Sequence, residues 1–171
     1  SLAFHRRLVP DDVYRQGISR LEPQDFRYAQ ELGYAIKSLA IATVEDGEDG
    51  SIQARVYPAL VPLDHMLAKV DGAYNAVEVE GDLCGRGLFH GLGAGREPTT
   101  SAVVGDLIEI SRKIGAEGRP TPMAQLDGAD GIRPIDDMES RYYLRLTVAD
   151  HAGVLAEIAR ILGDGNISIA S

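Results

Sequence analysis

Residues 34–45 are mostly small and apolar, residues 51–60 alternate between apolar and polar, and two further strand-like segments follow, so the first half of the chain predicts two β-hairpins. The four expected strands are residues 34–45, 51–60, 73–80 and 84–90. An Asp-Gly or Gly-Asp step lies between the members of each pair, which favours a hairpin turn. Pro58 and Pro62 are expected to end the second strand, because proline has no N–H for a central ladder. The carboxylates of residues 45–50 do not have the spacing and terminal Glu of a calcium loop, so a solvated turn is expected there.

Apolar residues at intervals of three and four predict helices on both sides of these strands. The expected helical segments are residues 13–21, 26–32, 65–70, 101–114 and 154–162. Asp11 or Asp12 can cap the first helix, and Gly33 can end the second. The apolar face of the fourth helix consists of Val103, Leu107, Ile110 and Ile114. Strands with helices before and after them predict an α+β fold, in which helices pack on one face of an antiparallel or mixed sheet.

The composition changes after residue 115 and indicates a domain boundary. Residues 116–140 are crowded with Gly, Pro and Asp, which is typical of a linker. Beyond it, alternation over residues 142–148, a helix, and a further strand over residues 166–170 predict the opening β-α-β of a second domain. We therefore expect a first domain over residues 1–115, incomplete at its amino end, and the first half of a second domain over residues 141–171.

Charge and cysteine content exclude several classes of partner. The net charge of −9 and a pI near 4.8 argue against a nucleic-acid partner or an anionic membrane surface. No apolar run approaches the roughly 18 residues of a membrane span. The only cysteine, Cys84, excludes internal disulfides and cysteine-ligated metal sites, so a reducing, cytoplasmic location is expected. Cys84 is expected to be a small buried residue, and the four scattered histidines have no metal-ligand spacing.

A glycine-rich stretch between the fourth strand and the fourth helix is the strongest candidate for a binding site. Gly91, Gly93 and Gly95 alternate there, and backbone without Cβ atoms lets a ligand come close. Pro98 suits the first helical position, where free N–H groups and the helix dipole favour an anion. The candidate caps are Glu97, Thr99 and Thr100. The pattern is not a dinucleotide fingerprint, because the third glycine and the later acidic residue are missing. A tight turn without a ligand and a ligand-contacting turn both stay open, with His90 as a candidate to face the ligand.

No motif for catalysis appears in the chain. Lys37 stands in an otherwise apolar strand, and an ion pair or a contact with a helix end is expected there rather than a catalytic role. No serine lies in a G-x-S-x-G motif and no Walker-type lysine is present, which excludes the corresponding hydrolase and phosphotransfer motifs.

Five short segments keep the order and spacing of one enzyme family over residues 1 to about 115. They read VYRQGI at 13–18, LGYAIK at 32–37, NAV at 75–77, GD at 81–82, and GAG at 93–95 followed by PTTSAVV at 98–104. Together they resemble homoserine dehydrogenase, which interconverts homoserine and aspartate 4-semialdehyde with a nicotinamide cofactor. The tail reads YYLRL at 142–146, GVLA at 153–156 and NIS at 166–168. It resembles the opening of an ACT domain, a ferredoxin-like βαββαβ module that binds amino acids.

The first resemblance implies a substrate-binding and dimerisation domain of an oxidoreductase in threonine, methionine and isoleucine biosynthesis. In that family a Rossmann domain holds the pyrophosphate of NADP or NAD. The proton-moving lysine and the substrate carboxylates lie in a segment that ends before the first residue here, so no catalytic residue is expected in this chain. Gly93, Ala94 and Gly95 are expected to approach the nicotinamide end of the cofactor, with Thr99 and Thr100 as weaker additions. The strands imply the interface of a homodimer or homotetramer.

The ACT resemblance implies weak effector-site candidates at Asp150, Gly153 and Asn166, for an amino acid such as threonine. It also keeps two alternatives open. The chain can be an amino-acid-binding regulatory module without catalysis, or a structural fragment without activity. Turnover of homoserine and calorimetry with aspartate-family amino acids distinguish these hypotheses.

Overall fold

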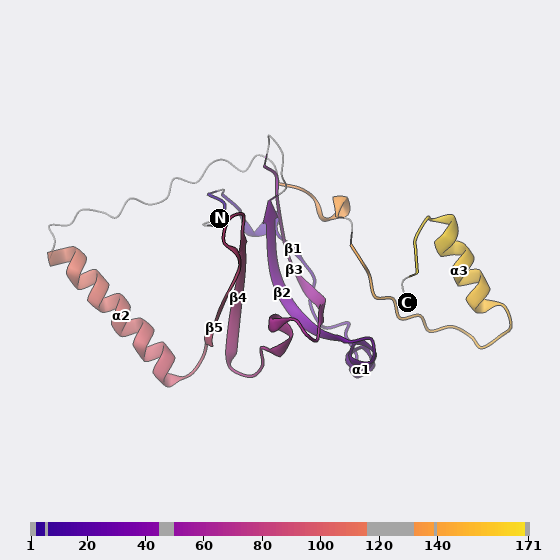
Figure 1. Ribbon diagram of the computed structural model, residues 1–171, viewed down its shortest axis with the longest axis horizontal. Coiled ribbons are helices and arrows are strands. Elements are labelled where there is room, and N and C mark those ends of the chain that lie inside the picture. Colours follow the sequence, from indigo (N-terminus) through magenta and orange to yellow (C-terminus); the bar gives the residue numbers. More distant parts are fainter. Residues whose placement is uncertain (1–2, 6, 45–49, 116–131, 139, 170–171) are drawn as a thin grey trace. The chain divides into compact units, whose positions relative to one another are not determined.

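The computed structural model describes residues 3–5, 7–44, 50–115, 132–138 and 140–169. The chain divides into two compact units, Ser1–Met138 and Glu139–Ser171. Three α-helices and two small β-sheets make up the regular structure of the described residues (Figure 1), which confirms the predicted α+β class.

The larger sheet has three strands in the order β1-β3-β2. Strands β2 (Tyr34–Val44) and β3 (Ile52–Pro62) pair antiparallel over their whole length, from Tyr34 opposite Pro62 to Val44 opposite Ile52. This is the first predicted hairpin. Its turn, including residues 45–49 and the excluded calcium loop, lies outside the described residues.

Of the two prolines predicted to end this strand, Pro62 is its last residue, whereas Pro58 lies inside it, so the part predicted for Pro58 is wrong. Val56 presents its carbonyl oxygen to the N–H of Gln16 at 2.8 Å. Alternate residues of a strand point their backbone groups to the same side, so the nitrogen of Pro58 also points away from β2. On that side the short strand β1 pairs only with Arg55 and Val56. The missing N–H therefore costs no ladder bond between β3 and β2.

The helix expected over residues 13–21 is also wrong. Residues Pro10–Asp12 form a single 3₁₀ turn, and the chain then extends into β1 (Tyr14–Arg15), which runs parallel to β3. A short segment interrupted by Gly17 has few intrahelical hydrogen bonds to offset its nucleation cost. The open edge of β3 supplies backbone partners instead, so the segment becomes a strand.

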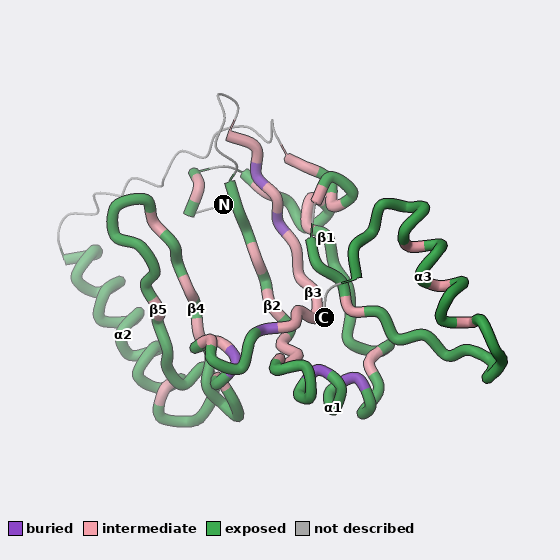
Figure 2. The backbone as a smooth tube through the Cα atoms, turned by 45° about the vertical axis from the view of Figure 1, so that its right-hand side comes forward, coloured by how far each residue is buried: buried purple, intermediate pink, exposed green. Residues whose placement is uncertain are grey.

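Helix α1 (Pro23–Glu31) confirms the second predicted helix and packs on β2. A buried Asp25, 4% exposed, accepts a hydrogen bond from the N–H of Glu22 at 2.8 Å and so caps the amino end. Gly33 ends the helix with a positive φ of 83°, a conformation that glycine adopts without a Cβ penalty. The core of this unit is small (Figure 2), and its buried apolar residues are Ala29, Ile52, Ala54, Val61 and Ala68.

Strands β4 (Tyr74–Gly81) and β5 (Gly85–Leu92) form a separate two-stranded sheet and confirm the second predicted hairpin. Gly81 pairs with Gly85, and three residues form the turn between them. Cys84 lies in that turn and is exposed, so the prediction that it is buried is wrong. A residue at a hairpin tip has few neighbours to cover it.

Lys37 makes both of the contacts expected for it. Its ammonium donates to the carbonyl oxygen of Val70 at 2.7 Å and to Asp71 Oδ1, also at 2.7 Å. Val70 directly follows the 3₁₀ helix η2 (Met66–Lys69), which is the single helical turn predicted at residues 65–70. The lysine therefore connects the end of η2 to β2, as a helix-end contact and an ion pair together.

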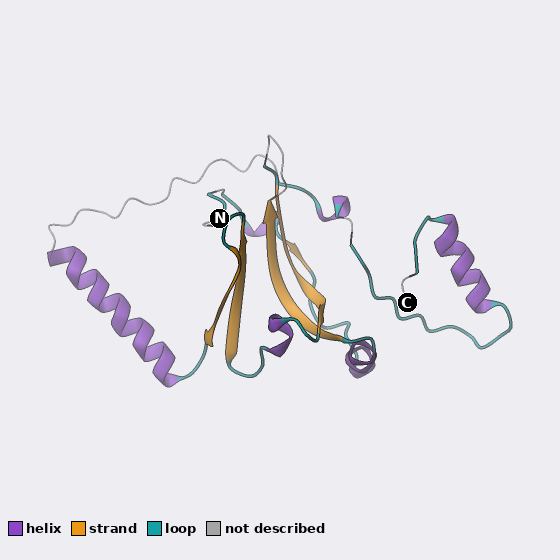
Figure 3. Cartoon of the chain, in the orientation of Figure 1, coloured by secondary structure: helices purple, strands orange, loops and turns teal. Residues whose placement is uncertain are grey.

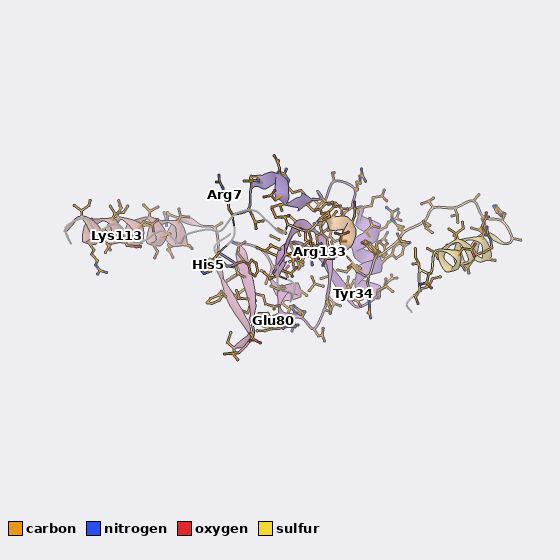
Figure 4. All side chains as sticks on the ribbon, turned by 90° about the horizontal axis from the view of Figure 1, so that it is seen from above. His5, Arg7, Tyr34, Glu80, Lys113 and Arg133 are labelled. Atoms are coloured by element: carbon orange, nitrogen blue, oxygen red, sulfur yellow. The ribbon has the colours of Figure 1, made fainter. Side chains whose placement is uncertain are left out.

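Helix α2 (Arg96–Gly115) confirms the fourth predicted helix but begins five residues earlier than the predicted range of 101–114. None of its residues is buried, and side chains such as that of Lys113 radiate from it on all sides (Figure 4). Its predicted apolar face therefore has no covering partner among the described residues.

Residues at the end of the predicted linker return to the larger sheet. Ile132 forms a parallel bridge with Ile52, and the N–H of Arg133 donates to the carbonyl oxygen of Ile52 at 3.0 Å. The side chain of Gln53 reaches the carbonyl oxygen of Pro134 at 3.3 Å. Residues 132–138 are thus part of the folded unit, whereas residues 116–131 of the predicted linker lie outside the described residues.

The unit Glu139–Ser171 contains one helix, α3 (Val154–Asp164), as predicted. The strand predicted over residues 142–148 is not formed, and residues 165–169 form no strand either (Figure 3). A strand needs a neighbour for its backbone N–H and C=O groups, and no described segment of this unit supplies one. The alternating side chains Tyr142, Leu144, Leu146 and Val148 are consequently exposed. No helix in the described ranges is both long and apolar enough to span a bilayer.

Candidate functional site

The predicted glycine turn joins the end of β5 to the start of α2 (Figure 1). The N–H of Gly93 donates to the carbonyl oxygen of Ala73 at 3.0 Å, which extends the β4–β5 ladder by one position. Gly95 has a φ of +122°, which side-chain-bearing residues rarely adopt. Gly93, Ala94 and Gly95 are all exposed. The turn therefore has the open, side-chain-poor surface that contact with a ligand requires.

The start of α2 differs from the prediction. The helix begins at Arg96, so Pro98 occupies its third position rather than its first. The N–H of Thr99 donates to the carbonyl oxygen of Gly95 at 3.1 Å, and the hydroxyl of Thr100 donates back to the carbonyl oxygen of Arg96 at 2.7 Å. Neither threonine caps the helix, because they are its fourth and fifth residues.

The two faces of the β4–β5 hairpin carry different groups beside this turn. Tyr74 and His90 lie on one face with their rings stacked, 4.8 Å between centroids and 6° between planes. Asn75 lies on the opposite face, because successive residues of a strand point to opposite sides. The structure thus places the His90 ring against Tyr74, and it places Asn75, which sequence reasoning missed, against Gly93.

A shallow hollow of about 380 Å³ lies on the Tyr74 face of the hairpin and is distinct from the glycine turn. The residues that line it are Asp64, His65, Met66, Glu78, Arg86, Gly87 and Leu88. His65 Nε2 lies 3.6 Å from Glu78 Oε2, and His65 Nδ1 accepts a hydrogen bond from the N–H of Leu67 at 3.3 Å. These contacts connect η2 to β4, so His65 has a structural role.

Within the described ranges, no group of three or more His, Cys, Asp or Glu side chains is arranged to hold a metal ion. Lys37 is engaged by Val70 and Asp71, as described above. On α2, a hydrogen bond from Lys113 and then its charge lower the pKa of Glu109. That pair belongs to the helix surface, so the chemistry of the candidate site rests on backbone geometry.

The three effector-site candidates do not converge in the unit Glu139–Ser171. Gly153 directly precedes α3 with a φ of 94°, whereas Asn166 follows its carboxyl end with a φ of 53°. The 11 residues of α3 separate them, which is ~16 Å of helix. Asp150 lies before Gly153, in a stretch without regular structure. Gly153 and Asn166 therefore do not lie together within the described residues of this unit.

The sequence and the fold match one family. The family model described as homoserine dehydrogenase matches residues 1–108. A homoserine dehydrogenase from Mycobacterium tuberculosis is 47% identical over 175 residues, and one from Pseudomonas aeruginosa is 43% identical over 176 residues. The solved structure of a homoserine dehydrogenase from Thiobacillus denitrificans matches 99% of this chain with a TM-score of 0.72 and 39% identity.

These relatives are considerably longer than the chain. The alignment with the Mycobacterium tuberculosis protein covers 99% of the chain but 39% of that protein. The alignment with the Pseudomonas aeruginosa protein covers 100% of the chain but 40% of that protein. The Thiobacillus denitrificans structure is covered to 40% of its length. The family model covers more than half of the chain, and the matched residues include both hairpins and the glycine turn. The chain therefore belongs to the homoserine dehydrogenase family.

Proposed function

We propose that this chain acts in the NAD- or NADP-dependent interconversion of L-homoserine and L-aspartate 4-semialdehyde, as the part that closes over the nicotinamide. In this role Gly93, Ala94 and Gly95 contact the nicotinamide end of the cofactor, while the pyrophosphate is held elsewhere in the protein. The residues present fit such a contact because the turn is exposed and two of its three residues have no side chain. When bound, the cofactor supplies the hydride chemistry.

The single observation that carries this proposal is the conformation of the turn at the junction of β5 and α2. Gly95 has a positive φ in this exposed turn, at the residue directly before the helix begins. A Cβ at Gly95 would have Pro98 Cδ as its nearest neighbour at 3.5 Å, so packing leaves room for a side chain. The need for glycine there is conformational, together with the space that it leaves for a ligand. Thr99 and Thr100 lie inside α2 and have at most a supporting part in this contact.

We further propose that the larger sheet takes part in a homo-oligomer, a dimer or tetramer. The strand order places β2, with 11 residues, at an edge of the sheet. A long edge strand presents unpaired backbone groups, which proteins usually cover. The exposed apolar face of α2 also suits burial in an assembly. In such an assembly the unit Glu139–Ser171 contributes Gly153 or Asn166 to a site for an amino-acid effector such as threonine.

The experiment is a segment exchange. The 171 residues replace the aligned segment of the Mycobacterium tuberculosis homoserine dehydrogenase, and reduction of NAD or NADP by homoserine is followed by absorbance. We expect turnover from the exchanged enzyme, and no reduced cofactor from the 171-residue chain alone, because a hydride needs both its donor and a positioned acceptor.

Two glycine variants of the exchanged enzyme test whether the turn contributes to cofactor binding. Gly95→Ala is expected to raise the KM for the cofactor because alanine disfavours a φ of +122°. Gly87→Ala is the matched control, since it lies in β5 where a Cβ meets only Val79 O at 3.9 Å. An exchanged enzyme that folds but does not oxidise homoserine would refute the proposed activity. Equal cofactor KM values for the two variants would refute the role of the turn.

A further inference from the structure

Asn75 lies directly against the glycine turn. A Cβ built on Gly93 would overlap with Asn75 Nδ2 and would lie 2.6 Å from Asn75 Cγ. The carboxamide therefore fills the space that any side chain at position 93 would need. By contrast, a Cβ on Gly91 in the same strand would meet nothing within 4 Å. The contact is specific to the last residue of the hairpin before the turn.

The strand register explains how this contact arises. Asn75 is paired with Gly91, and Gly93 pairs through its N–H with Ala73. Asn75 and Gly93 are therefore diagonal neighbours on one face of the ladder, a separation that a medium-sized side chain spans. Both residues are exposed, so no surrounding core holds the carboxamide in this position. The bare Cα of Gly93 is what gives the carboxamide its place.

We infer that Asn75 is a positioning residue for the cofactor-contacting turn: its carboxamide braces Gly93 and so sets the direction in which Ala94 and Gly95 leave the hairpin. The inference rests on the proposed function, because it assigns Asn75 a part in the site proposed there. Gly93 and Gly95 then need to be glycine for different reasons. Gly95 needs a positive φ, whereas Gly93 has no such φ and needs an empty Cβ position that Asn75 can occupy.

This difference predicts how variants combine. In Gly93→Ala the new methyl group displaces the carboxamide, which is the mobile end of a flexible side chain. In Asn75→Ala the carboxamide is removed directly. Both changes leave Gly93 unbraced, so they have the same consequence. In the double variant the two closest clashing atoms are gone, and the nearest atom left to the new Cβ at residue 93 is Asn75 Cβ at 3.4 Å, which is ordinary contact.

The kinetic test uses the segment-exchanged enzyme described above. We expect Asn75→Ala to raise the KM for the cofactor about fivefold, which is ~1 kcal/mol, while the KM for homoserine stays within about twofold. Gly93→Ala is expected to do the same, and the double variant to be no worse than either single variant. If Asn75 had only a structural role, its loss would lower stability without raising the KM for the cofactor relative to the KM for homoserine. Gly87→Ala again serves as the matched control.

A second measurement reads the position of the turn without any cofactor. In nitrogen-15 NMR spectra of the 171-residue chain, Asn75→Ala is expected to shift the amide signals of Ala94 and Gly95 and to leave those of Gly85 and Gly87 in place. Unshifted turn signals overturn the inference, as does a cofactor KM in Asn75→Ala equal to that of the parent. Multiplying effects in the double variant overturn it as well. If instead the Gly95→Ala enzyme has an unchanged cofactor KM, the proposed role of the turn in cofactor binding fails, and the NMR result still decides whether Asn75 positions the turn.

Discussion

Replacing Lys37 with methionine tests which of its two contacts stabilises the fold. The lysine ammonium lies 2.7 Å from both Val70 O and Asp71 Oδ1. The side chain of Lys37 is 21% exposed, whereas that of Asp71 is 83% exposed. Water therefore solvates the carboxylate readily when the lysine is lost, but it solvates the half-buried carbonyl oxygen of Val70 less well. Methionine keeps the apolar stem and removes only the charged donor.

The magnitude follows from these exposures. An exposed ion pair contributes ~0–1 kcal/mol, so Asp71→Asn is expected to cost ~0.5 kcal/mol. A hydrogen bond from a charged donor to a partly buried acceptor contributes ~1.5–3 kcal/mol, so Lys37→Met is expected to cost ~2 kcal/mol. For a chain of this size each kcal/mol lowers Tm by roughly 2–4 °C, which gives a fall of about 4–8 °C for Lys37→Met.

The assay is urea and thermal unfolding of the 171-residue chain followed by circular dichroism. The urea m-value is expected to stay constant, because the surface exposed on unfolding does not change. Lys113→Met is the matched control, since Lys113 makes an exposed pair with Glu109 with side chains 51% and 64% exposed. Should Asp71→Asn cost as much as Lys37→Met, or Lys113→Met cost as much as Lys37→Met, the argument that the Val70 carbonyl dominates is wrong.

Two further outcomes follow from the helices. The Lys113 ammonium, through its hydrogen bond and then its charge, holds the pKa of Glu109 below its usual value. The stabilisation of α2 is therefore present above the unfolded-state pKa and is lost as pH falls through the lower, folded value. Carbon-13 NMR shifts of α2 are expected to lose a small helical contribution on acidification through that range, and to lose less in Glu109→Gln; an equal acid response in both would contradict this. Gly153 and Asn166 lie at opposite ends of α3. Calorimetric titration of the 171-residue chain with threonine is therefore expected to give no saturable heat. Saturable binding would contradict this, because it would show that the unit Glu139–Ser171 forms a complete site by itself.

The elements predicted correctly are those whose side-chain pattern and local partners agree. Each strand of the pairs β2–β3 and β4–β5 has a complementary strand next to it in the sequence, so the strand-like pattern and the hydrogen bonding favour the same structure. The paired state of Lys37 was also predictable, because an ammonium in an apolar strand needs an acceptor. Its partner at Val70, 33 residues away, was not.

The elements predicted wrongly are those whose structure depends on which other segment of the chain lies beside them. Residues 13–21 have a helical apolar spacing, but the open edge of β3 offered backbone partners to Tyr14 and Arg15. Residues 142–148 have a strand pattern, but no described segment of their unit lies beside them to form a ladder. Cys84 is small and apolar, but the hairpin turn exposes it.

The candidate site likewise has features that follow from the local sequence and features that depend on the tertiary structure. The sequence by itself determined that a side-chain-poor turn follows β5 and precedes a helix, because glycine spacing and apolar periodicity are local properties of the chain. Only the tertiary structure decided that Gly95 needs a positive φ, that Gly93 faces Asn75, and that His90 stacks on Tyr74. Those facts depend on the register between two strands, and register is set by the packing and pairing of whole strands rather than by the residues of the turn.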